Sequence, residues 1–220
     1  MLKKISLILS ILLISAVASF AQGSCSCSVG NGGCSASQTC GSGEAVCVCS
    51  ASGCSSSCSR GGGELLLGGL TRRGVRQLRN ATNPETISKS LSKAIGKEIV
   101  FKPASSGFKF NFSMPKKGPF SHWDVLEYLP SAGTLKINGG EIKFWQGLRN
   151  TLLKGGEFNI CAGNAPAQTI LNEIKFLSGK SFKIVAGDSQ ARFDSPIKGN
   201  SLAELIENLS KSRGVTIVEN

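Results

Sequence analysis

Eight of the nine cysteines in this chain lie between Cys25 and Cys58, and this cluster constrains the fold more than any other feature. The surrounding segment, residues 24–59, is otherwise mostly serine and glycine. Its only larger apolar side chains are Val29, Val46 and Val48, and it contains no aromatic residue. Such a segment cannot offset its loss of conformational entropy by burying apolar surface. We therefore expect it to be mostly irregular and to be held together covalently or by metal.

The cysteines form two similar halves, each a C-x-C motif followed by two further cysteines. Each half has enough thiols to close two disulfides or to hold one metal ion with four thiolates. The C-x-C spacing and the absence of histidine from the segment favour disulfides, but roughly a hundred pairings are possible. The predicted disulfide residues, which are also the ligands in the metal alternative, are Cys25, Cys27, Cys34, Cys40, Cys47, Cys49, Cys54 and Cys58.

Residues 1–21 have the pattern of a cleavable signal peptide. Lys3 and Lys4 precede an apolar run from Ile5 to Ala18, and Ser19-Phe20-Ala21 places small residues at a cleavage site. The run is short for a membrane span, although a retained N-terminal anchor is the alternative, and no later segment approaches roughly 18 consecutive apolar residues. We expect a soluble, exported chain with no membrane span after signal removal, in a compartment that permits disulfides.

The chain is basic, with a formal net charge of +11. This charge favours anionic partners such as acidic proteins or lipid head groups, or it serves only solubility. Nucleic acid is not an expected partner of an exported protein. Residues 60–83 are predicted to be a Gly/Arg-rich linker, either an anionic docking strip or a solvated tether, and the candidate docking residues are Arg72, Arg73, Arg76 and Arg79.

From Asn83 onward the sequence has ordinary globular composition and contains a repeat. The first copy, residues 84–147, has a predicted helix that starts after Asn83 and ends at Gly96. Two strands, a helix with a capping-box pattern and a hairpin are expected to follow, at residues 99–101, 108–112, 121–129 and 135–144 respectively. In this hairpin, Leu135–Ile137 and Ile142–Phe144 are the two strands around Asn138-Gly139-Gly140.

The second copy, residues 156–220, repeats this order after a short strand at Phe158–Ile160. Its expected elements are a helix ending at Gly179, strands at 182–184 and 193–197, a helix opened by Ser201 and a strand at 215–217. The predicted fold class is α+β, with two small tandem modules of helix-strand-strand-helix-strand order behind the disulfide-rich segment.

A family resemblance rests on segments of both copies: Phe158–Ile160, Ser201–Leu209, Gly214–Ile217, Trp123–Leu129 and Thr134–Ile142. Over residues 83–220 the chain resembles tandem short secretin/TonB N-terminal (STN) domains. The resemblance implies a periplasmic or secreted protein of a Gram-negative-type envelope, with modules that serve in subunit packing or signalling contacts. The cysteine-rich segment lies outside the family pattern, and pore formation and iron uptake are not implied. We also expect an open sheet edge at the end of the second copy, ready to pair with a partner strand.

No catalytic constellation is recognisable. His122 is the only histidine and is expected to pack at the surface beside Trp123, while Cys161 is expected to be a buried, inert thiol and Trp145 a core residue. No catalytic residue, cofactor or metal site is therefore predicted. The sequence favours a non-enzymatic envelope protein that contacts other envelope proteins, or a second copy of itself, through its tandem modules. The alternative is a metal-binding or redox-sensing cysteine-rich protein with the modules as scaffold.

Overall fold

The computed structural model describes residues 23–29, 35–40, 44–59, 70, 72–79, 81, 83–114, 120–163, 165–190, 192–193 and 196–220. The predicted signal peptide and most of the predicted linker lie outside these residues. The structure has helices and strands in one chain, so the expected α+β class is confirmed. No helix within the described ranges combines the length and the apolar character that crossing a membrane requires.

The cysteine-rich segment is not irregular, and that expectation is wrong. It forms four strands, which pair as two antiparallel ladders: β1 (Gly23–Ser28) with β2 (Ser35–Cys40), and β3 (Glu44–Ser50) with β4 (Gly53–Ser59). Ladder hydrogen bonds satisfy the backbone without large side chains, so a serine-rich segment adopts strands once disulfides and a neighbouring sheet fix it in place.

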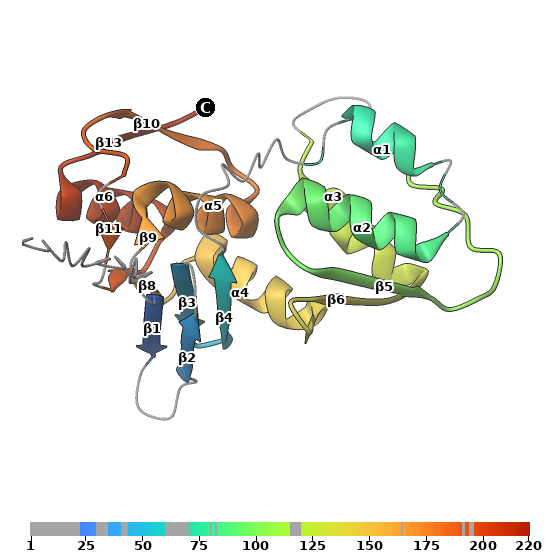
Figure 1. The fold of residues 1–220 in the computed structure, drawn as a ribbon, viewed down its shortest axis with the longest axis horizontal. Coiled ribbons are helices and arrows are strands. Elements are labelled where there is room, and N and C mark those ends of the chain that lie inside the picture. The colour runs from blue at the N-terminus through green and yellow to red at the C-terminus, as the bar shows by residue number, and fades with distance from the viewer. Residues whose placement is uncertain are drawn as a thin grey trace, which may run out of the picture.

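Strand β3 is shared with the second module. It pairs antiparallel with β8 (Phe158–Gly163), which pairs in turn with β12 (Ile197–Gly199), giving a four-stranded sheet in the order β12-β8-β3-β4. All seven residues of β3 are buried because both faces of the sheet are covered. Figure 1 shows β1 to β4 gathered beside β8 and α4.

The two faces of this sheet belong to two separate clusters of buried residues. Val46, Val48 and Ile160 pack into the main hydrophobic core with the helices. Cys47 and Cys161, which alternate with them along the strands, pack instead with the cysteines of β1. The cysteine-rich segment therefore forms an outer layer of the second module.

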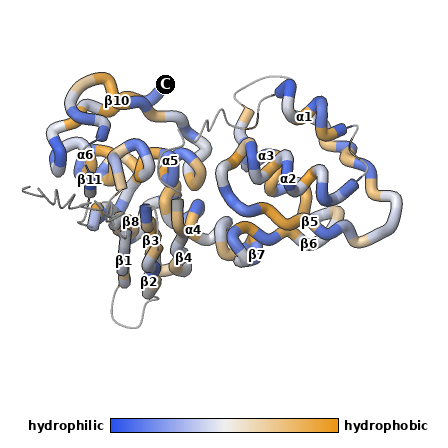
Figure 2. The backbone as a smooth tube through the Cα atoms, in the orientation of Figure 1, coloured by the Kyte–Doolittle hydropathy of each residue, from blue (hydrophilic) through white to orange (hydrophobic). Residues whose placement is uncertain are grey.

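The first module contains α2 (Pro84–Ile95), α3 (His122–Tyr128), a 3₁₀ turn (Leu129–Ser131) and a three-stranded antiparallel sheet. The strands of the sheet are β5 (Ile99–Pro103), β6 (Gly133–Ile137) and β7 (Gly140–Glu141). Helix α1 (Arg72–Leu78) lies in the predicted linker, but its Val75 and Leu78 are buried in the main core, so the linker expectation is wrong for this stretch. In Figure 2 hydrophobic residues recur along β5 and β6 beneath the helices.

The helix ends of the first module follow the predicted signals. The Asn83 side chain accepts a hydrogen bond from the amide of Glu85, and Gly96 ends α2 in the left-handed region at φ 73°. Ser121 and Asp124 form the predicted capping box of α3.

Two strand predictions for this module are wrong. Ile142–Phe144 is not the second strand of a hairpin but the first turn of α4 (Ile142–Lys154), whose buried residues recur every three or four positions. Residues 108–112 form no strand ladder, although Phe110 and Phe112 are buried and pack edge-on or tilted against each other and against Tyr128. They alternate as a strand would, but they lie beside no partner strand.

The second module follows the predicted order except at the strand expected over residues 193–197, where the structure has two short strands with different partners, β11 (Arg192–Phe193) with β9 (Ala165–Pro166) and β12 with β8. After β8 come β9, α5 (Ala167–Ser178), β10 (Phe182–Ala186), β11, β12, α6 (Leu202–Arg213) and β13 (Thr216–Glu219). Strands β9 and β11 form a short pair, and β10 and β13 form a separate two-stranded sheet. In Figure 1 the β10–β13 pair lies on the side of α5 and α6 opposite to β8.

Candidate functional site

The three disulfides that the structure describes all join one half of the cysteine repeat to the other. Their Cα–Cα distances are 5.7–6.0 Å, and the pairs are Cys25–Cys47, Cys27–Cys49 and Cys40–Cys58. Each bond links equivalent positions of the two halves rather than closing a half on itself. Cys54 is also disulfide-bonded, and Cys34 lies outside the described residues. The disulfide interpretation is thus confirmed, and sulfur atoms in disulfides do not provide the thiolates that a metal site needs.

Strand β1 lies very close to the sheet below it because the sheet carries a glycine at the point of contact. A Cβ atom at Gly163 would lie only 1.9 Å from the backbone oxygen of Ser24. Cys25 and Cys27, on the inner face of β1, can therefore reach Cys47 and Cys49 on β3.

Cys161 is a free cysteine in this cluster, and it is buried, as expected, with 7% of its surface exposed. It lies directly opposite Cys47 in the β3–β8 register. Its Sγ is 3.7 Å from Oδ1 of Asn159. Burial raises the pKa of the Cys161 thiol, and the positive charge of Lys198 acts in the opposite direction.

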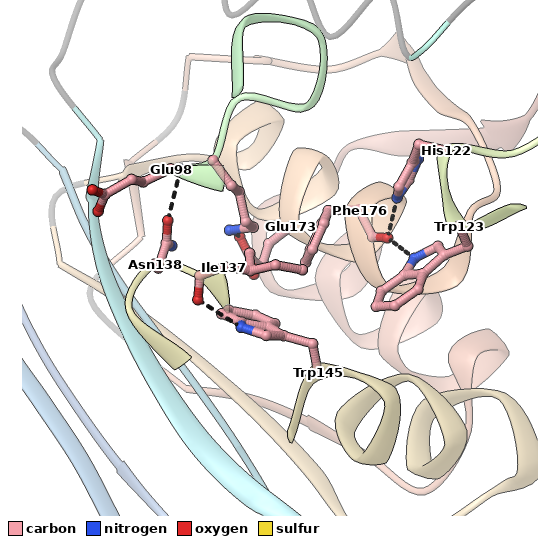
Figure 3. Close-up of polar contacts among 9 residues, drawn as sticks. Glu98, His122, Trp123, Ile137, Asn138, Trp145, Glu173 and Phe176 are labelled. Carbon is pink, nitrogen blue, oxygen red and sulfur yellow. Dashed lines mark hydrogen bonds and ion pairs between the residues drawn. The ribbon is translucent and has the colours of Figure 1, made fainter. Parts of the chain in front are cut away.

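The two modules meet at a buried ion pair. Nζ of Lys97, which follows α2, lies 2.6 Å from Oε2 of Glu173 on α5, and the two side chains are only 7% and 9% exposed. The ammonium group also lies 4.8 Å from the ring centroid of Phe176 and 5.4 Å from that of Trp145. Figure 3 shows Glu173 beside Trp145, and Phe176 beside Trp123.

A backbone carbonyl of α5 holds the first module through α3. The oxygen of Phe176 accepts hydrogen bonds from Nε1 of Trp123 and from Nε2 of His122, the latter at 2.7 Å (Figure 3). Carbonyls in the last turn of a helix lack partners within the helix, so α3 provides the missing donors. This contact explains why His122 is buried and not at the surface as expected.

Burial makes His122 a neutral imidazole. It lowers the pKa of His122 from 6.5 to about 4, mainly by desolvation and against the opposing effect of the Phe176 hydrogen bond. Because a carbonyl oxygen only accepts, Nε2 carries the proton. Trp145 is buried as predicted, and its Nε1 donates to the oxygen of Ile137 at 2.8 Å.

The arginines of the predicted docking strip lie on and next to α1. Val75 and Leu78 bury one side of this helix, while Arg72, Arg73, Arg76 and Arg79 are exposed. Two of the four also contact the protein itself. Arg79 donates from Nη2 to the oxygen of Phe112 at 3.0 Å, and Arg72 lies over the ring of Phe120.

The β10–β13 sheet exposes apolar side chains. Val185 on β10 is 51% exposed and Val218 on β13 is 37% exposed. On the other face, Phe182, Ile184 and Ile217 pack against the core. Neither strand pairs with a further strand among the described residues.

Sequence reasoning missed the Lys97–Glu173 pair and the pairing of β3 with β8.

Within the described ranges, no group of three or more His, Cys, Asp or Glu side chains is arranged to hold a metal ion. Comparison with known protein families, curated proteins and solved structures finds no match for this chain.

Proposed function

We propose that this chain is a non-enzymatic, exported envelope protein that binds an extended segment of another envelope protein along its β10–β13 sheet. The proposal keeps the secretin/TonB-like interpretation of the tandem modules and a periplasmic or secreted location. The observation that carries it is the exposed β10–β13 pair, with Val185 and Val218 outward.

Among the described residues neither edge of the β10–β13 pair has a partner strand, and such an edge is a favourable template for strand addition. Main-chain hydrogen bonds supply affinity, and alternate side chains of the added strand contact the exposed face. Lys183 faces Val218 across the pair and adds positive charge to this surface. These features suit an extended segment with apolar residues on one face and an acidic residue beside them.

The chemistry of the two most reactive side chains supports a role without catalysis. His122 packs against Phe176 with its Nε2 engaged, and its low pKa makes it a weak base at neutral pH. Cys161 is buried among the disulfide-bonded cysteines of β1 and β3, where burial raises the pKa of its thiol. The two residues pack in different clusters and form no catalytic pair.

The test uses the full exported chain, because removing residues before 83 would remove β3 from the sheet. The variant V185K/V218K replaces both exposed valines with lysine, which natural edge strands tolerate. The matched control is Val100→Lys, since Val100 is 37% exposed on a strand of the first module. Immobilised wild type and V100K should retain the same envelope protein, and V185K/V218K should lose it by at least tenfold. Equal retention by all three proteins would contradict the proposal.

A second candidate function, redox sensing by the cysteine-rich layer, is favoured by one observation. A free thiol, Cys161, lies directly opposite a disulfide-bonded cysteine, Cys47. The metal-binding form of this alternative has no such support, because the candidate ligand cysteines that the structure describes are in disulfides.

A further inference from the structure

We infer that Cys161 is a thiol–disulfide exchange partner of the Cys25–Cys47 bond, so that the oxidised protein has two disulfide isomers. This inference stands on the sheet register and on the cysteine cluster, and it is independent of the protein-contact proposal.

The register of the sheet and the direction of the side chains place Cys25, Cys47 and Cys161 together. Cys47 and Cys161 are directly opposed in an antiparallel ladder, so their side chains leave the same face of the sheet. Cys25 reaches that face from β1, which packs over both β3 and β8. Opposed residues in such ladders have Cα atoms about 4.5–5.5 Å apart, within the range of about 4.4–6.8 Å that disulfides span. The Cα spacing of this pair therefore permits a Cys47–Cys161 bond.

Two polar residues, Lys198 and Asn159, share the face of the sheet on which Cys161 lies. Lys198, whose charge favours the thiolate, lies on β12 opposite Asn159 in the ladder, and therefore on the same face as Cys161. Asn159 holds the thiol through its Oδ1 and donates from Nδ2 to the oxygen of Ser28 on β1 at 3.4 Å. Asn159 thus fixes the thiol and the covering strand together.

The exchange needs no external oxidant. The Cys161 thiol loses its proton, and its thiolate attacks Sγ of Cys47. The new Cys47–Cys161 bond forms as the Cys25–Cys47 bond breaks, and Cys25 leaves as a thiolate that takes up a proton. One thiol and one disulfide exist before and after the step, so no electrons are gained or lost.

The two isomers differ in what the disulfide holds. In the described isomer, Cys25–Cys47 clips β1 onto the sheet. In the exchanged isomer, a covalent bond joins β3 to β8, and of the two described disulfides from β1 to β3 only Cys27–Cys49 remains. The exchange therefore removes one covalent link from the covering strand, which stays paired with β2, and creates a free thiol at Cys25.

The experiment locates the free thiol. The full oxidised chain is incubated at pH 7 to 9, quenched in acid, unfolded and labelled with N-ethylmaleimide, after which mass spectrometry identifies the labelled cysteine. Label should begin on Cys161 and move to Cys25, with a rate that rises about tenfold per pH unit while the thiol is mostly protonated. Label that stays on Cys161 at pH 9, or that moves to Cys47, overturns the inference.

Two serine variants provide a matched comparison that does not depend on the exchange rate. Cys25→Ser frees Cys47, which faces Cys161, whereas Cys27→Ser frees Cys49, which faces Asn159. With oxidised glutathione, C25S should form a Cys47–Cys161 bond and lose both thiols. C27S should keep Cys161 open to labelling after unfolding. Equal behaviour of the two variants, with native circular dichroism in both, would refute the predicted pairing.

Discussion

The ion pair between Lys97 and Glu173 makes a sharp prediction about how the two modules are joined. Lys97→Met and Glu173→Leu each remove one charge and leave the other buried without a counter-ion. We expect each single variant to lose about 3–5 kcal/mol of unfolding free energy. The double variant replaces the pair with apolar side chains of similar size and should be more stable than either single variant by about 2 kcal/mol or more.

The magnitude follows from the geometry of the pair. At 2.6 Å and an effective dielectric constant of about 20, the attraction between the charges is about 6 kcal/mol. The desolvation of two ions, several kcal/mol each, offsets most of it. Each single variant loses the attraction but keeps the desolvation penalty of the remaining ion. Methionine in place of Lys97 retains apolar contact with Phe176 and Trp145, so the loss reports mainly on charge.

Urea denaturation followed by tryptophan fluorescence is a suitable assay. The chain has two tryptophans, Trp123 and Trp145, and both pack against Phe176 at the junction. Lys180→Met is the control, because its pair with Glu219 is about half exposed and should contribute less than about 1 kcal/mol. Losses that are small and additive in the Lys97 and Glu173 variants would refute the argument.

Three further predictions concern pH, packing and capping. The unfolded chain protonates His122 near pH 6.5 but the folded chain only near pH 4, so stability should fall by about 3 kcal/mol as pH drops through this window. His122→Gln should remove that part of the pH dependence of the unfolding free energy, measured by urea titrations at several pH values. An unchanged pH dependence would contradict the assignment. Gly163→Ala should displace β1, because the new Cβ meets the backbone of Ser24; thiol counting after oxidative refolding should find additional free cysteines, and a wild-type count would show that β1 tolerates the methyl group. Asn83→Ala should cost about 1 kcal/mol by removing the cap of α2, whereas Asn83→Asp should restore stability; equal thermal melting of the two variants would count against the capping role.

Local signals were sufficient for much of the fold. The caps at Asn83, Ser121 and Ser201 and the glycines that end α2 and α5 act within one turn of chain, and the structure has each of them. Alternation over three residues was too short to decide between strand and helix at Ile142–Phe144, because the stripe that defines α4 becomes visible only over a longer window.

The features that sequence reasoning missed depend on distant partners. Nothing local to β3 indicates that β8 lies beside it. A lysine and a glutamate such as Lys97 and Glu173 look like ordinary surface charges until the modules meet. His122 similarly has no local reason to be buried, because its partner is the carbonyl of Phe176 at the end of another module's helix. For the same reason, the spacing of the cysteines could not predict that the disulfides join one half of the repeat to the other.

The shared sheet has a consequence for how this chain reaches its native state. Synthesis delivers β3 long before β8, and contacts in this region join positions as far apart as Ser28 and Asn159, separated by 131 residues. Until β8 arrives, Val46 and Val48 have no layer to cover them. Closing so large a loop is a slow, late event. Before it occurs the apolar side chains of β3 are uncovered, and a chaperone would bind the chain in this interval.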